Sequence, residues 1–124
     1  MIRKLGKNME LEKTIRMNVL FSFYGELLTP KQAQHMADYY EEDHTLAEIA
    51  DNHGVSRQAI YDSIKRTEEL LIEYEDKLQL IKDFNRRNEA INKLNEHLEE
   101  HYKEDAELRT LVNEIIQDSI REEN

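Results

Sequence analysis

The stretch from Thr45 to Arg66, TLAEIADNHGVSRQAIYDSIKR, constrains the fold of this chain more than any other part of it. Thr45 and Glu48 have the spacing of a capping box, which predicts that a short helix begins after this threonine. Gly54 predicts where that helix ends, because glycine enters the left-handed conformation at little cost. Ser56 can then cap a second helix. The stretch is therefore expected to fold as two helices joined by a tight turn.

The apolar residues of this stretch have the spacing that packs two such helices together. Ala50 lies where the helices are expected to cross, and a larger side chain there would push them apart. Val55, Ile60 and Ile64 follow the glycine at one, six and ten positions, so that they hold the second helix against the first. His53 stands where an apolar residue would be usual, and we expect its ring to pack while partly exposed. The combination predicts a helix-turn-helix motif.

The face of the second helix opposite its apolar residues is open to a ligand. Six residues are candidates for contact with DNA on that face: Ser56, Arg57, Gln58, Tyr61, Lys65 and Arg66. Arg57 and Gln58 lie at the end that enters a major groove first, where arginine can read guanine and glutamine can read adenine. Tyr61 can reach phosphate or a thymine methyl group, whereas Lys65 and Arg66 suit phosphates. The alternative interpretation is a set of ordinary solvated side chains.

The charge distribution separates this motif from the rest of the chain. The formal net charge is −10, and residues 67–124 hold 8 Lys and Arg against 17 Asp and Glu. Residues 1–66 hold 9 against 10, and residues 56–66 carry three positive charges and one negative charge. Acidic surfaces repel nucleic acid. The motif is therefore the part of the chain suited to phosphate, and the acidic tail is expected to face solvent or a partner.

Helices are expected throughout the chain, because three glycines and one proline leave few signals for strands and turns. We predict helices over 10–28 and 30–42 before the motif. A long recognition helix is expected from Arg57 into the eighties, with a break near 85–88 where the sequence is polar and rich in asparagine. A helical tail should follow over 91–116, where apolar residues recur in steps of three and four.

The predicted fold class is all-α, in two parts. Residues 9–81 should form a helix-turn-helix bundle with a long recognition helix, and residues 82–124 an acidic C-terminal helical extension. Residues 1–8 are expected to be disordered. The helix over 10–28 carries two apolar stripes, so that it is either a central core helix or partly a dimer interface. These stripes are Ile15, Val19, Phe23 and Leu27, and beside them Leu20, Phe21, Tyr24 and Leu28.

The sequence gives no sign of catalysis, of a cofactor or of a membrane. It has no cysteine, and its isolated glycines form no phosphate-binding loop. His97, His101 and Glu104 have a spacing that can hold a metal, but histidines on an exposed acidic helix are more often simply solvated, so no metal is expected. No apolar run approaches the ~20 residues of a membrane-spanning helix. The beginning of the chain lacks the apolar segment of a signal peptide, which favours the cytoplasm.

Two longer stretches resemble known proteins. The segment TPKQAQHMADYYEEDHTLAEIADNHGVSRQAIYDSIKRTEELL looks like region 4 of bacterial sigma factors, which binds the −35 promoter element through a helix-turn-helix. LEKTIRMNVLFSFYGELLTPKQ, followed by YYEEDHTLAEIADNHGVSRQAIYDSIKRTEELLIEYEDKL, resembles the YlxM-like family of small helix-turn-helix proteins over about Met9 to Ile81. Members of that family are typically encoded beside the signal recognition particle GTPase. The resemblance therefore implies an accessory or regulatory role in that pathway.

Two functions are consistent with these observations. The first is a transcriptional regulator that binds double-stranded DNA, in which pairing into a homodimer joins two weak half-sites. The second is an accessory protein that binds an RNA or protein component of the signal recognition particle. The two differ in what they require of Arg57, because a purely protein partner would be indifferent to its loss, whereas DNA would not.

Overall fold

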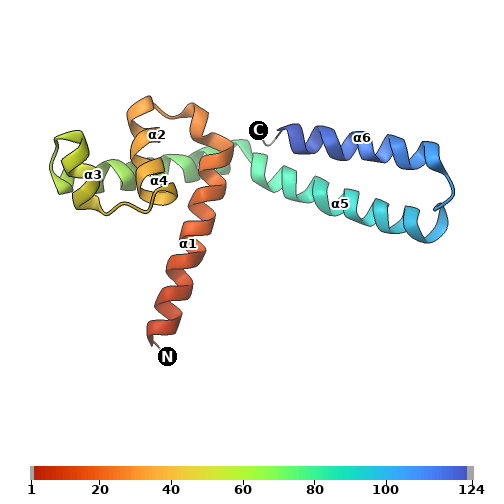
Figure 1. The fold of residues 1–124 in the computed structure, drawn as a ribbon, viewed down its shortest axis with the longest axis horizontal. Coiled ribbons are helices and arrows are strands. Elements are labelled where there is room, and N and C mark those ends of the chain that lie inside the picture. Colours follow the sequence, from red (N-terminus) through yellow and green to blue (C-terminus); the bar gives the residue numbers. More distant parts are fainter. Residues whose placement is uncertain (1, 123–124) are drawn as a thin grey trace. The chain divides into compact units, whose positions relative to one another are not determined.

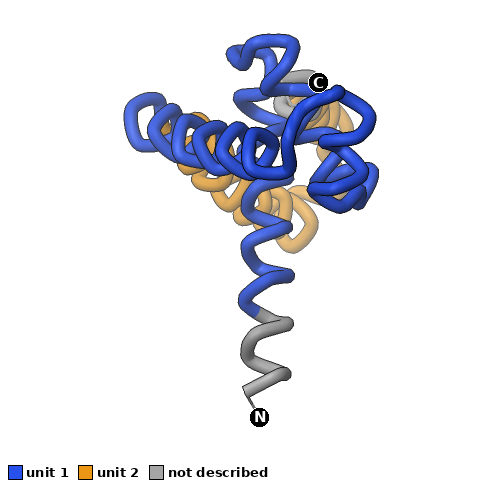
Figure 2. Tube along the Cα trace, turned by 90° about the vertical axis from the view of Figure 1, so that its left-hand side faces the viewer, with its two compact units in different colours: residues 1–78 blue, residues 79–124 orange. Residues whose placement is uncertain are grey.

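The chain is described by a computed structural model that covers the backbone of residues 2–122 and the side chains of residues 9–118. The expectation about residues 1–8 lies outside the residues that are described in full. The described chain contains six α-helices and no strand, which confirms the all-α prediction. It divides into two compact units, residues 1–78 and residues 79–124 (Figure 2). The expected boundary lay three residues later, between 81 and 82.

Unit 1 is built on one long helix. Helices α1, α2 and α3 all pack against α4 (Figure 1). Two short turns complete the unit: a 3₁₀ turn after α1 and a π-helical turn that continues α2. The elements in order are α1 (Ile2–Tyr24), the 3₁₀ turn (Gly25–Leu27), α2 (Pro30–Met36), the π turn (Ala37–Glu41), α3 (Leu46–His53) and α4 (Arg57–Leu78).

The core of unit 1 lies along α4. Ile60, Ile64 and Leu71 are buried on this helix, and Ile49 and Ala50 of α3 pack against it, so the inward positions expected from the sequence are confirmed. The other buried apolar residues come from α1, the following turn and α2: Met17, Leu20, Tyr24, Leu28 and Met36. Burial of each such side chain contributes about 1.5–3 kcal/mol to the stability of the fold. Because these side chains gather along α4, this helix is the centre of the unit.

The two apolar stripes of α1 have different environments. Leu20, Tyr24 and Leu28 of the second stripe are buried, whereas Ile15 and Val19 of the first are exposed. Helix α1 is also held to α4 by polar contacts, because Lys13 Nζ lies 3.1 Å from Glu68 Oε2. The Tyr24 hydroxyl donates to Glu75, and the Tyr40 hydroxyl from the π turn donates to Glu68 at 2.9 Å. The second stripe thus contributes to the core, whereas Ile15 and Val19 of the first remain exposed. 

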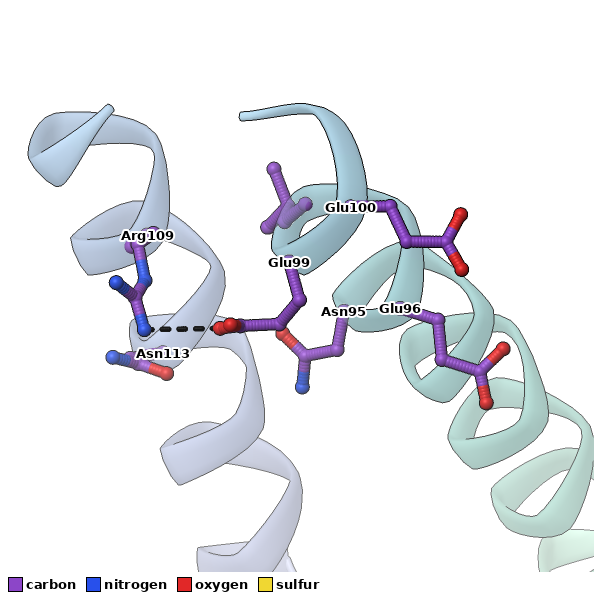
Figure 3. Close-up of a pocket in the computed structure, with 7 residues that line it drawn as sticks. Asn95, Glu96, Glu99, Glu100, Arg109 and Asn113 are labelled. Atoms are coloured by element: carbon purple, nitrogen blue, oxygen red, sulfur yellow. Dashed lines mark hydrogen bonds and ion pairs between the residues drawn. The ribbon is translucent and has the colours of Figure 1, made fainter. Parts of the chain in front are cut away.

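Unit 2 is a helical hairpin of α5 (Leu80–His101) and α6 (Ala106–Glu122) (Figure 1). Leu98 and Val112 are its buried side chains in the described range. Arg109 Nη2 donates to Glu99 Oε1 across the hairpin at 2.9 Å (Figure 3). The hairpin presents acidic side chains to the solvent, as its composition indicated.

The predicted helix break near 85–88 is wrong. Those residues lie inside α5, where Asn85, Arg86 and Arg87 are exposed and Arg86 pairs with Asp83 at 3.0 Å. Polar residues did not interrupt the helix because they point to solvent. The helix instead ends at Leu78, and Gln79 holds a left-handed φ of 55° before α5 begins.

Candidate nucleic-acid interface

The turn of the helix-turn-helix motif is formed by the caps that the sequence predicts. Thr45 Oγ1 accepts from the backbone N–H of Glu48 at 3.1 Å, and Glu48 Oε1 accepts from the N–H of Thr45 at 3.4 Å. Gly54 ends α3 with φ of 67°, in the left-handed region. Ser56 Oγ accepts from the N–H of Ala59 at 3.0 Å. The helix start, the glycine turn and the second cap are therefore all confirmed.

Val55 does not hold the second helix against the first as expected. Its side chain is 37% exposed and lies on the rim of a groove between α2 and α4. The packing beneath the turn comes instead from the ring of His53, which approaches the His35 ring edge-on with 4.7 Å between centroids. The histidine before the glycine therefore packs while partly exposed, which confirms the expectation for His53.

A polar cluster joins the motif to α2 and the π turn. His53 Nε2 lies 3.0 Å from Asp38 Oδ2, and Gln34 Nε2 donates to Asp38 Oδ1 at 2.8 Å. His35 Nδ1 lies 2.8 Å from Ser63 Oγ on α4. Asp38 and His35 are both buried. The cluster thus fixes the orientation of α3 and α4 relative to α2 through side chains that sequence spacing alone does not bring together.

The electrostatics of this cluster favour a charged aspartate and a neutral histidine. Burial raises the pKa of Asp38. The hydrogen bonds with His53 and Gln34 lower it by a larger total amount, so that the pKa lies below its ordinary value. Burial lowers the pKa of His35, and the nearby His53 and Lys31 lower it as well. The Nε2 atom of His35 is buried without a hydrogen-bond partner in the described structure. A second proton on this ring would therefore be poorly accommodated.

The predicted contact residues occupy the outer face of α4 and its N-cap. All six are exposed: Ser56, Arg57, Gln58, Tyr61, Lys65 and Arg66. Ser56 is occupied as a cap, and Gln58 Nε2 donates to Asp62 Oδ1 at 2.9 Å. Lys65 Nζ lies 5.7 Å from the centroid of the Tyr61 ring. Within the described part of the chain, Arg57 and Arg66 form no ion pair. Their contact with nucleic acid stays a prediction.

Two hollows flank this outer face. The larger, of about 420 Å³, lies between α2 and α4 and is lined by Lys31 and Arg66 among others. The smaller, of about 160 Å³, lies on the opposite flank of α4, where Lys13 and Lys65 line it together with Tyr61. Sequence spacing did not indicate Lys31, because it stands outside the motif. The recognition helix thus has basic residues on both sides as well as on its outer face.

Unit 2 offers a different surface. Its hollow of about 460 Å³ is lined by Glu96, Glu99 and Glu100 with Arg109 and two asparagines (Figure 3). Such an acidic lining would repel phosphate. The ring centroids of His97 and His101 lie 4.6 Å apart with the rings tilted by 46°, and no described group of three or more His, Asp or Glu is arranged to hold a metal ion. None of the described helices is long and apolar enough to cross a membrane.

Comparison with known proteins identifies the family. Residues 11–119 match a family described as "Putative helix-turn-helix protein, YlxM / p13 like". The UPF0122 protein YlxM of Bacillus subtilis (strain 168) is 54% identical over 104 residues, which cover 84% of this chain and 94% of the relative. A UPF0122 protein of Geobacillus kaustophilus (strain HTA426) is 51% identical over 105 residues, covering 85% and 96%. One from Limosilactobacillus reuteri (strain DSM 20016) is 48% identical over 115 residues, covering 93% and 100%.

These matches confirm the resemblance that was inferred from the residues around the turn. The family description and the observed helix-turn-helix agree on the same segment of the chain, and the matched region extends beyond it through the acidic hairpin. This chain therefore belongs to the UPF0122 family of YlxM-like helix-turn-helix proteins.

Proposed function

We propose that the helix-turn-helix of α3 and α4 binds double-stranded DNA and that the protein is a transcriptional regulator of the cytoplasm, without a catalytic role. One observation carries the proposal: the exposed residues in the first part of α4, over 57–66, include three positive charges and one negative charge in a chain of net charge −10. Arg57 stands at the N-terminal end of α4, clear of any ion pair among the described residues. An arginine in that position can donate two hydrogen bonds to guanine in the major groove.

To contact a base, Gln58 must first give up its hydrogen bond to Asp62. Its amide nitrogen donates to Asp62 in the free protein, and both side chains are exposed. An exposed hydrogen bond of this kind is worth about 0.5–1.5 kcal/mol, so that an adenine edge can replace it at small cost. Asp62 would then lie beside the DNA groove, where its negative charge repels phosphate. This repulsion would disfavour binding of the helix in a shifted position along the DNA.

Homodimer formation is supported by the uncovered stripe of α1. Leu11, Ile15 and Val19 are exposed and follow one another at intervals of four residues, so that they lie along one face of the helix. Glu12 and Arg16 flank this stripe. Antiparallel pairing of two copies centred on Ile15 would bring each Glu12 near Arg16 of the other copy, and the apolar stripe would be buried. A dimer joined in this way would bind two half-sites at once, and the gain in affinity would compensate for the small basic surface of each subunit.

Selection of bound fragments from a genomic library, followed by affinity measurement on the selected duplex, tests the proposal. Arg57→Ala should weaken binding by about 1–3 kcal/mol and relax sequence preference at one position. Arg86→Ala, on the exposed face of α5, serves as the matched loss of an arginine and should leave affinity unchanged. Absence of binding to any fragment at low salt would reject the proposal.

The acidic hairpin favours one second candidate. Its surface suits a basic protein partner rather than nucleic acid, which fits an accessory role toward a signal recognition particle component. Pull-down of the intact chain, with recovery of DNA, RNA and protein from the same sample, separates the two. Recovery of a particle component that is insensitive to Arg57→Ala would replace the first proposal with this one.

A further inference from the structure

The groove between α2 and α4 has a basic rim and a neutral floor. Lys31 on α2 and Arg66 on α4 contribute to its lining, and both side chains are exposed. Neither cation is engaged in an ion pair in the portion of the chain that the structure describes. The lining includes Ser63 and the buried residues His35 and Ile60. The groove therefore presents two positive charges, and the carboxylate of Asp62 is the one negative charge in its lining.

We propose that this groove receives a phosphate of the DNA backbone, with Lys31 and Arg66 as its two cationic contacts. The proposal rests on the DNA binding proposed above and extends it to a residue outside the motif. A helix inserted in a major groove of about 12 Å width has a sugar–phosphate strand along each of its flanks. Arg66 lies four residues beyond Asp62, and both line the groove on the α2 side of the helix. At 100° per residue, Arg66 is about half a revolution away from Arg57, so it faces α2 and not the edge where Arg57 lies.

The two flanks of α4 differ in how much of their charge is available. On the flank opposite α2, Lys13 is already paired with Glu68 at 3.1 Å. On the α2 flank, Asp62 is the one acidic residue lining the groove, and one of its oxygens already accepts from Gln58. Each flank thus holds two cations and one carboxylate. Among the described residues, both cations of the α2 flank lack an ion pair, whereas on the opposite flank only Lys65 does. The α2 flank therefore has more cations available to a phosphate strand.

The position of Lys31 within α2 also indicates a role other than stability. It is the second residue of the helix, after Pro30, and α2 has no acidic residue in its first turn. A positive charge at the beginning of a helix is unfavourable because the backbone N–H groups there carry partial positive charge. The pKa of His35 in the groove lining is lowered by burial, by His53 and also by the charge of Lys31, so this charge acts within the groove. A lysine that weakens its own helix is better explained by a ligand than by folding.

Salt dependence of affinity for the selected duplex tests the proposal in the full-length protein. Each phosphate contact contributes about 0.9 to the slope of log K against log salt. Lys31→Ala and Arg66→Ala should each reduce the slope by about that amount, with sequence preference unchanged. When salt is raised from 50 to 200 mM, the factor by which affinity falls should therefore be roughly 3-fold smaller for either variant than for the wild type. Lys31→Arg should retain the wild-type slope, because it keeps the charge.

Controls separate this proposal from the function on which it rests. Lys77→Ala, at the exposed end of α4, removes a lysine paired with Glu73 and should leave the slope unchanged. A wild-type slope in Lys31→Ala, with DNA still bound, would overturn the groove contact and leave the proposed function standing. Failure of the wild type to bind any duplex would overturn both. Displacement of the duplex by inorganic phosphate at constant ionic strength would show a site for the free ion and would also overturn the backbone assignment.

Discussion

His53 Nε2 lies 3.0 Å from Asp38 Oδ2, and this contact joins the last turn of the first motif helix to the π turn before it. The two residues are fifteen positions apart in the sequence, and Asp38 is buried. A buried carboxylate needs partners, and His53 and Gln34 supply them. The orientation of the helix-turn-helix within unit 1 therefore depends on a polar contact as well as on its apolar core.

Loss of this carboxylate should destabilise the protein. Asp38→Ala leaves His53 and Gln34 without their acceptor, and we expect the free energy of unfolding in urea at pH 7 to fall by about 1–3 kcal/mol. Asp51→Ala removes an exposed carboxylate of α3 and should change this free energy by no more than about 0.5 kcal/mol. Equal effects of the two substitutions would contradict a structural role for Asp38.

Stability should also decline in mildly acidic solution because of His35. The groups that face this ring are Lys31 on its own helix, Asp38 in the π turn, His53 on α3 and the neutral Ser63 on α4. The pKa of His35 lies below its ordinary value of about 6.5, so the unfolded chain binds the proton more readily than the folded one. The stabilising effect is complete above pH 6.5 and is lost as pH falls toward the folded pKa.

Urea unfolding at pH 7.5 and at pH 5.5 measures this effect. His35→Gln keeps a hydrogen-bonding group beside Ser63 but cannot titrate, so that its free energy of unfolding should vary less between the two pH values. The pKa of Asp38 is also lowered, and the stability that it contributes is lost only below its ordinary value of about 3.8, outside this window. An identical pH dependence in wild type and variant would refute the assignment to His35.

Gly54 can be tested separately from its surroundings. A Cβ built at this position meets no atom within 4 Å, so any cost of Gly54→Ala comes from its φ of 67°. We expect about 1 kcal/mol of destabilisation, and less for Gly54→Asn, because asparagine tolerates the left-handed region. Gly25→Ala is the matched control, since its Cβ would stand 3.5 Å from the Phe21 ring, an ordinary contact. A loss from Gly25→Ala as large as that from Gly54→Ala would exclude the backbone explanation.

The parts of the fold that the sequence predicted are those encoded by neighbouring residues. The capping box at Thr45, the turn at Gly54 and the inward positions Ile60 and Ile64 each follow from local spacing. The outer face of α4 was predictable for the same reason, because fixing the buried side of a helix also fixes its exposed side. Local rules were thus sufficient to define the motif and the candidate contact residues on it.

Contacts between distant residues were not predictable in this way. His35 and Ser63 are 28 positions apart, and only the packing of α2 on α4 brings them to 2.8 Å. The same packing brings Lys31 to a groove that residues of α4 also line. The end of α4 was missed for a different reason: the glutamine at 79 adopts a left-handed φ without the glycine or asparagine that usually marks such a position.

This left-handed glutamine gives a prediction in which one substitution has opposite effects at two sites. Gln79 has a φ of 55°, which is unfavourable for a residue with a Cβ, and Gln79→Gly should raise the free energy of unfolding by up to about 1 kcal/mol. Gln117→Gly, within α6 and exposed, should lower it by roughly the same amount, because glycine is a poor helix former. Urea unfolding followed by circular dichroism measures both. Destabilisation by both variants would mean that the left-handed turn at Gln79 carries no strain that glycine can relieve.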